Sequence, residues 1–141
     1  MKVLFDTNII LDVLLKREPH AEVAIKLLSA VENNFIQGCL CATTLTTIDY
    51  LLAKAIGKQL AKKHITSLLS LFLIAEVNDK TLKAALDSDF DDFEDAVLYY
   101  SGHNVNIDCV VTRNYEDFIA AQLPIHKPHE LWSLISNNDT K

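Results

Sequence analysis

Two groups of acidic residues, far apart in the sequence, carry the side chains most able to do chemistry. The stretch VLFDTNIILDVL places Asp6 directly after an apolar run, with Asn8 two residues later. The stretch DDFEDA places Asp92 and Asp95 three residues apart, which puts both carboxylates on one face of a helix. Mg²⁺ and Mn²⁺ take oxygen ligands, and carboxylates that share such an ion can support metal-assisted hydrolysis of a phosphodiester.

A third polar group, Thr112, Arg113 and Asn114, follows a β-branched and apolar run. Each group also has an ordinary structural explanation. Asn8 is a candidate N-cap that starts a helix, acids at 91–95 favour a helix N-terminus through its dipole, and Asn114 suits a turn. A common location in the fold would favour a functional site over these separate explanations.

The elements that would position these groups alternate between strands and helices. Short apolar and β-branched runs predict strands over residues 2–5, 35–43, 73–77, 107–112 and 123–128, the last an edge strand flanked by prolines. Helical spacing of apolar residues predicts helices over 8–34 with a break at Pro19, and over 43–57, 58–72, 78–88, 91–104, 113–121 and 129–136. The helix over 43–57 is expected to be capped by a Thr and to end at Gly57.

This alternation predicts an α/β fold with a parallel sheet of about five strands covered by helices on both faces. Ligands of such sheets bind beyond the carboxyl ends of the strands. Asp6 and Thr112 each follow a predicted strand, and Asp92 begins a predicted helix between them. We therefore expect the polar groups to meet at one edge of the sheet, where a divalent cation would offset the repulsion between carboxylates.

Composition limits the class of protein. The chain has 141 residues, half of them hydrophobic, and a formal charge of −6. An acidic chain is unlike a general nucleic-acid binder, so any contact with RNA must use a local basic patch or metal ions. Three cysteines without a C-x-x-C motif argue against disulfides or structural zinc and predict buried free thiols: Cys39, Cys41 and Cys109.

No signal peptide or membrane-spanning segment is recognisable, because the most apolar stretch, LLSLFLIAEV, is too short to cross a bilayer. We expect a cytoplasmic protein that does not bind membranes. One domain is predicted over residues 1–136, followed by a disordered tail over 137–141.

The segments VLFDTNIILDVLL and DDFEDAVLYYSGHNVNIDCVVTRNYEDF together resemble the PIN-domain family, over about residues 2–130. The resemblance implies a Rossmann-like fold, and an activity as a Mg²⁺- or Mn²⁺-dependent ribonuclease. Bacterial members are often toxins of toxin–antitoxin pairs, so it also implies an antitoxin partner and a homodimer.

The resemblance also implies roles for individual residues. Asp6, Asp92 and Asp95 match the metal-binding acids, and Asn114 matches a position that is Asp in many of these nucleases. Thr7 and Asn8 match the polar residues that brace the first acid. Three further supporting candidates come from sequence position and not from the resemblance: Thr112, Asp49 and Asp117.

Two positions depart from the family pattern. Thr47 stands where many members carry a Glu, and Asp49 would face about 200° away from that position on a helix. Asn114 brings an oxygen ligand without a charge, although Asp117 could substitute for it if 114–118 is helical. These departures leave open a degenerate PIN domain that binds RNA or protein without cleaving.

RNA would be contacted first by Arg113, which adjoins the predicted site and has a forked guanidinium. Lys54 and Lys58 belong to a lysine cluster around Gly57 and are further candidates. His126 and His129 flank Pro128, which breaks helical geometry, so we expect them in turns or on the surface. A phosphatase or receiver domain of similar topology is disfavoured, because DTN lacks the second acid that either site needs.

Overall fold

The structure is a computed structural model, and it describes residues 1–139 of the chain. Five parallel strands form one sheet in the order β3-β2-β1-β4-β5. The strands are β1 (Lys2–Phe5), β2 (Gln37–Cys41), β3 (Leu73–Ala75), β4 (Cys109–Val111) and β5 (Ile125–His126). Val3 pairs with Gly38 of β2 on one side and with Cys109 of β4 on the other. The predicted parallel sheet is confirmed, and β5 lies at its edge as expected.

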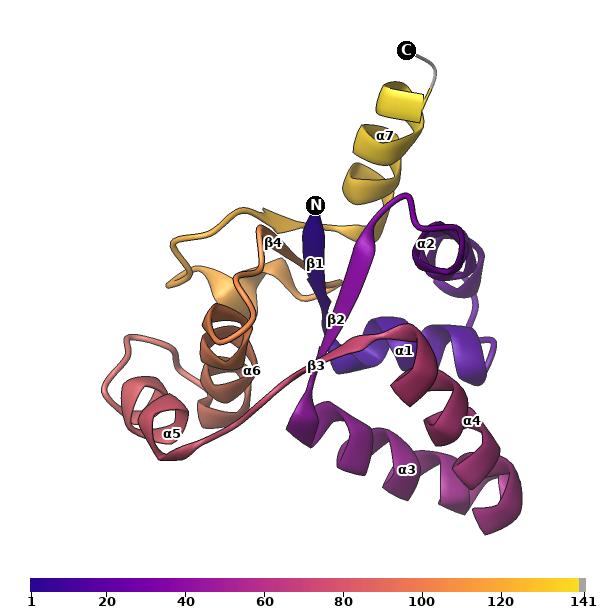
Figure 1. The fold of residues 1–141 in the computed structure, drawn as a ribbon, viewed down its shortest axis with the longest axis horizontal. Helices are drawn as coiled ribbons and strands as arrows, with labels where there is room; N and C mark the ends of the chain where they lie inside the picture. Colours follow the sequence, from indigo (N-terminus) through magenta and orange to yellow (C-terminus); the bar gives the residue numbers. More distant parts are fainter. Residues whose placement is uncertain (140–141) are drawn as a thin grey trace.

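Seven α-helices and one 3₁₀ helix connect and cover the strands of the described chain. They are α1 (Thr7–Leu14), α2 (Ala21–Glu32), α3 (Ala42–Ile56), α4 (Lys58–Leu71), α5 (Asp79–Leu86), α6 (Phe93–His103), the 3₁₀ helix η1 (Tyr115–Phe118) and α7 (Pro128–Asp139). α5 and α6 lie on one side of the sheet, and α1 to α4 with α7 lie on the other (Figure 1).

Two hydrophobic clusters fill the spaces between the sheet and its helices. Val3 and Phe5 of β1 belong to the larger cluster, with Leu27 of α2 and Leu131 of α7. Leu4, between them in sequence, belongs to the cluster under α5 and α6. The strand therefore buries successive side chains on opposite faces, which explains its uninterrupted apolar sequence.

The three cysteines are all free and buried, as predicted. Cys39 and Cys41 of β2 face the cluster under α5 and α6, whereas Cys109 of β4 faces the larger cluster. Burial raises the pKa of the Cys39 and Cys109 thiols to about 11.

Several predicted boundaries differ in the structure. α3 begins after Cys41, which has no side-chain capping bond, so the expected Thr cap is wrong and Thr43 lies inside the first turn. The predicted helix over 113–121 is only the short η1. α7 continues to Asp139, three residues into the segment predicted as a tail, and residues 140 and 141 lie outside the described residues.

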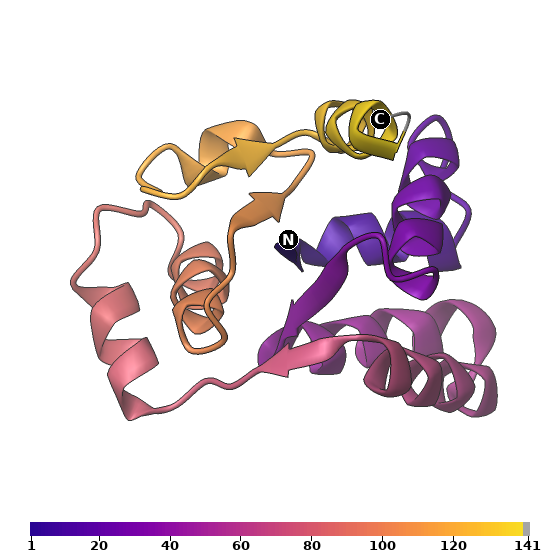
Figure 2. The same cartoon turned by 45° about the horizontal axis from the view of Figure 1, so that its top comes forward.

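Gly57 ends α3 as predicted, with φ 92° and ψ 159°. A side chain at this conformation is strained, so glycine is what allows α4 to start directly after α3. The two helices lie side by side as a hairpin (Figure 2).

No helix within residues 1–139 is both long and apolar enough to cross a membrane.

Candidate functional site

Asp6 occupies the point of the sheet where strand order reverses. It directly follows β1, the central strand, and its N–H donates to Val111 O of β4 (3.0 Å). Chain connections leave β1 and β4 in opposite directions across the sheet, and ligands of open α/β sheets bind at such a position. Asp6 is also the N-cap of α1, which corrects the expectation that Asn8 starts this helix.

Hydrogen bonds hold both oxygens of the Asp6 carboxylate. Oδ1 accepts from Thr7 N–H (2.8 Å), and Oδ2 accepts from the hydroxyl of Thr112 (2.7 Å). The residue is only 6% exposed. Burial raises the pKa of Asp6, the negative charge of Asp117 raises it further, and the two hydrogen bonds and the charge of Arg113 oppose this rise.

Thr112 links Asp6 to the third polar group. Its fully buried hydroxyl donates to Asp6 and accepts from Asn114 N–H (3.0 Å). A single hydroxyl thereby fixes the carboxylate at the end of β1 and the chain that leaves β4. Thr7 makes a second link, since its hydroxyl lies 3.0 Å from that of Thr44 at the start of α3.

The acids at the start of α6 act on this site through their charge. Asp92 is the N-cap of α6, and its Oδ1 accepts from Glu94 N–H (2.7 Å) and Asp95 N–H (3.4 Å). Burial raises the pKa of Asp95 to about 7, and the negative charges of Asp92, Asp6, Asp117 and Glu94 contribute in that order. Acids at the end of β1, at the start of α6 and on η1 therefore all add negative potential at Asp95.

The donor set suits a hard divalent cation, because carboxylates that repel one another gain most from a shared positive charge. Even so, in the described part of the chain no three acidic, His or Cys side chains are gathered closely enough to enclose an ion. Asp92 is exposed, and it uses one carboxylate oxygen, Oδ1, to cap α6. The residue types fit the chemistry of a metal site, and Asp6 is the acid whose two carboxylate oxygens are held by hydrogen bonds.

The other supporting acids divide into two groups. Asp117, exposed on η1, raises the pKa of both Asp6 and Asp95, so it contributes negative charge to the site. Asp49 does not affect either pKa and instead lines a hollow between α3 and α4. Thr47 of α3 donates its hydroxyl to Thr43 O (3.2 Å).

Asp12 is a functional candidate that sequence analysis missed. Its carboxylate, 1% exposed, accepts from Arg17 Nε (2.9 Å), Arg113 Nε (2.7 Å) and Arg113 Nη2 (3.2 Å). Arg17 also donates to the side-chain oxygen of Asn8 (3.1 Å), which gives Asn8 a role in holding Arg17. The sequence did contain a signal for this ion pair: an acid inside the apolar run IILDVLL. A charged side chain at a buried helix position needs a partner of opposite charge.

The three predicted RNA contacts lie in two places. Arg113 is 24% exposed and beside the acids, with part of its fork turned to Asp12. Lys54 and Lys58 line the hollow of about 680 Å³ between α3 and α4, where the Lys54 ammonium lies 4.5 Å from the centre of the Tyr50 ring. This hollow contains Asp49 but none of the acids at the sheet edge.

Solved structures share this fold. FitAcB from Neisseria gonorrhoeae is 19% identical, with a TM-score of 0.71 over 90% of this chain and 98% of that one. A toxin–antitoxin complex from Klebsiella pneumoniae is 21% identical (TM-score 0.68; 91% and 98% covered). VapC20 from Mycobacterium tuberculosis, described as a sarcin-ricin loop cleaving toxin, is 14% identical (TM-score 0.61; 77% and 86% covered).

No curated protein matches the chain in sequence. The sequence pattern of the PIN domain matches residues 2–116, which include every acid of the site except Asp117. The resemblance seen in the two motifs, the strand order and the acids around Asp6 agree with this match: the chain belongs to the PIN-domain family.

Proposed function

We propose that this protein is a Mg²⁺- or Mn²⁺-dependent endoribonuclease that hydrolyses phosphodiester bonds at the edge of the sheet where β1 and β4 end. The observation that carries the proposal is the carboxylate of Asp6, held through both oxygens where β1 ends. Burial first, and then the negative charges of Asp92, Asp6 and Asp117, raise the pKa of Asp95 to about 7, so like charges act at one site. Structural ion pairs do not require like charges to be held together, whereas a cation site does.

The chain's own residues would divide the work. Asp6, Asp95 and Asp92 would hold the cation, with Thr112 and Thr7 fixing both oxygens of Asp6. Asn114 would orient a ligand or water through its side-chain amide. A divalent cation bound here supplies a Lewis acid for the phosphate and lowers the pKa of a coordinated water.

The partners follow from the fold's relatives and are part of the proposal. Structures of similar fold are toxin–antitoxin complexes, which supports an antitoxin partner for this chain. VapC20, described as cleaving the sarcin-ricin loop, supports RNA as the substrate class. We further propose that the protein forms a homodimer and acts in the cytoplasm.

A second candidate is a PIN domain that binds RNA or protein without cleavage. Thr47 and Asn114 favour it, since both stand where other family members carry an acid. Fewer carboxylates would weaken the hold on a cation or limit the site to one ion.

Calorimetric titration of Mn²⁺ into the wild type and Asp95→Asn, followed by incubation with a mixed RNA pool, separates these candidates. Asp87→Asn is the matched control, because Asp87 is exposed at the end of α5. A nuclease loses Mn²⁺ binding and cleavage together in Asp95→Asn and keeps both in Asp87→Asn. Mn²⁺ binding by a wild type that cleaves nothing supports the second candidate, and equal cleavage by all three proteins refutes the assignment.

A further inference from the structure

A small hollow of about 210 Å³ lies beside Arg113, at the same edge of the sheet as the acids. Its walls come from three separate segments: the turn between α1 and α2, the chain after β4, and the start of α7. Four of the seven lining residues are basic or can become so, and the others are two prolines and a valine. The lining residues are Pro19, His20, Val23, Arg113, Lys127, Pro128 and His129.

We propose that this hollow is a phosphate-binding subsite, which holds a backbone phosphate of the RNA next to the bond that is cut. The inference rests on the proposed nuclease function and specifies how an acidic protein holds its polyanionic substrate. Lys54 and Lys58, the other predicted RNA contacts, lie between α3 and α4 in a separate hollow.

Arg113 is the donor that the fold holds most firmly here. Asp12 accepts from its Nε and Nη2, which leaves the N–H groups of Nη1 outside this ion pair. The single charge of Asp12 is shared with Arg17, so the three side chains together carry a charge of about +1. Arg113 is thus immobilised without being neutralised, which lowers the entropy lost when it binds an anion.

The hollow also lies close to the acids of the site. Arg113 follows Thr112, whose hydroxyl holds Asp6, and consecutive Cα atoms are about 3.8 Å apart. The charge of Arg113 also lowers the pKa of Asp6, as a minor effect beside burial. An RNA strand with one phosphate at the acids would therefore reach the hollow with a neighbouring phosphate.

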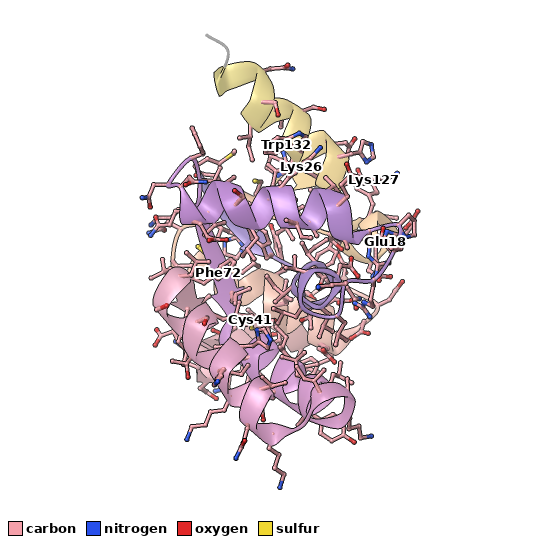
Figure 3. All side chains as sticks on the ribbon, turned by 90° about the vertical axis from the view of Figure 1, so that its right-hand side faces the viewer. Glu18, Lys26, Cys41, Phe72, Lys127 and Trp132 are labelled. Atoms are coloured by element: carbon pink, nitrogen blue, oxygen red, sulfur yellow. The ribbon has the colours of Figure 1, made fainter. Side chains whose placement is uncertain are left out.

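Two exposed acids lie near the hollow and limit its positive charge. Glu130 accepts from Lys127 N–H (2.8 Å) at the start of α7. Glu18 directly precedes Pro19, which lines the hollow, and Figure 3 labels it on the same side of the molecule as Lys127. The hollow is too small for a folded peptide segment but roomy enough for one phosphate and a few waters, which favours RNA over an acidic protein segment.

Binding of a fluorescein-labelled 12-nucleotide RNA, measured by anisotropy in EDTA, tests the subsite without cleavage. Lys127→Ala should bind about fivefold more weakly and reduce the slope of log K against log salt by about 0.7. Lys80→Ala removes one exposed charge from α5 and is the matched control, which should leave the slope unchanged. Glu130→Gln, which keeps an acceptor for Lys127 N–H, should tighten binding.

Lys127→Ala binding RNA as the Lys80→Ala control does would overturn the subsite. The subsite would also be overturned if Lys127→Ala bound RNA as the wild type does but bound a glutamate-rich peptide more weakly than the wild type. That result would assign the hollow to a protein partner. Inorganic phosphate should shift the amide NMR signals of Arg113 and His129 and spare that of Lys80. The nuclease proposal fails separately, if the wild type binds RNA through Lys127 but does not cleave it with Mn²⁺.

Discussion

Replacing Asp12 by Asn is the sharpest test of how the fold supports its site. The side chain is isosteric, so cavity effects are excluded, and what changes is the charge that two arginines share. Asp12 accepts three hydrogen bonds from cationic groups, at 2.7, 2.9 and 3.2 Å. An amide oxygen can accept only some of these bonds, and its NH₂ group would face guanidinium donors.

The loss in the free energy of unfolding caused by Asp12→Asn can be estimated from the burial of the three side chains. Breaking a buried ion pair by removing one partner costs about 3–5 kcal/mol. Asp12 is 1% exposed, but Arg17 and Arg113 are 36% and 24% exposed and can regain water. We therefore expect a loss of about 2–4 kcal/mol in the free energy of unfolding, less than the buried-pair range because of this hydration.

Urea unfolding followed by far-ultraviolet circular dichroism measures this loss, with an unchanged m-value expected. Arg17→Met is the companion variant, since Asp12 then keeps Arg113 and the loss should be smaller. Because the carboxylate is buried, 0.5 M NaCl should leave most of the effect in place. A loss below about 0.5 kcal/mol for Asp12→Asn would refute the reasoning, because such values are typical of substitutions at exposed sites.

Three other predictions concern separate features. Thr112→Val leaves Asp6 Oδ2 and Asn114 N–H without their partner and should cost about 1–3 kcal/mol in the free energy of unfolding. Thr112→Ser keeps the hydroxyl and should retain most of the stability that Thr112→Val loses. Urea unfolding distinguishes the two variants, and equal losses would contradict the role of the hydroxyl. The pKa of Asp95 is raised to about 7, so the folded metal-free protein holds a proton that the unfolded chain releases near pH 4. The stability of the metal-free protein should therefore fall as pH rises from about 4 to 7, and its Mn²⁺ affinity should fall as pH drops below 7. Calorimetry of Asp95→Asn should show neither trend. Gly57→Ala meets no atom within 4 Å, so its expected loss of about 1–3 kcal/mol reflects backbone strain alone, and an unchanged melting temperature would show that α3 and α4 readjust.

Much of the fold could be predicted because its strands are short, apolar and buried on both faces. KVLF and IDCVVT are central strands whose sequence leaves few alternatives, and the polar residues that end them mark the carboxyl edge. The expectation that Asp6 and Thr112 meet at this edge is supported by their hydrogen bond. Helix boundaries were less predictable, since Cys41 rather than a Thr precedes α3 and no side chain caps that helix.

The buried ion pairs could not be predicted from spacing. Asp12 and Arg113 are 101 residues apart, and only the docking of α1 against the chain after β4 brings them together. Similarly, the rotation of α3 that sends Asp49 into the hollow with Tyr50 depends on how α4 packs. The acids at 91–95 were expected to favour a helix N-terminus through its dipole, and they do lie at the start of α6. The N-cap role of Asp92 was not predicted.

The reactivity of the three buried thiols can report local opening of the protein. None can react with an alkylating reagent until its strand is uncovered, because each is buried. For Cys39 and Cys109 the raised pKa of about 11 also keeps the thiol un-ionised. Modification of Cys39 or Cys41 reports detachment of the layer containing α5 and α6, whereas modification of Cys109 reports loss of the opposite layer. Mass spectrometry of the alkylated peptides would therefore show which side of the sheet opens first, without any added label.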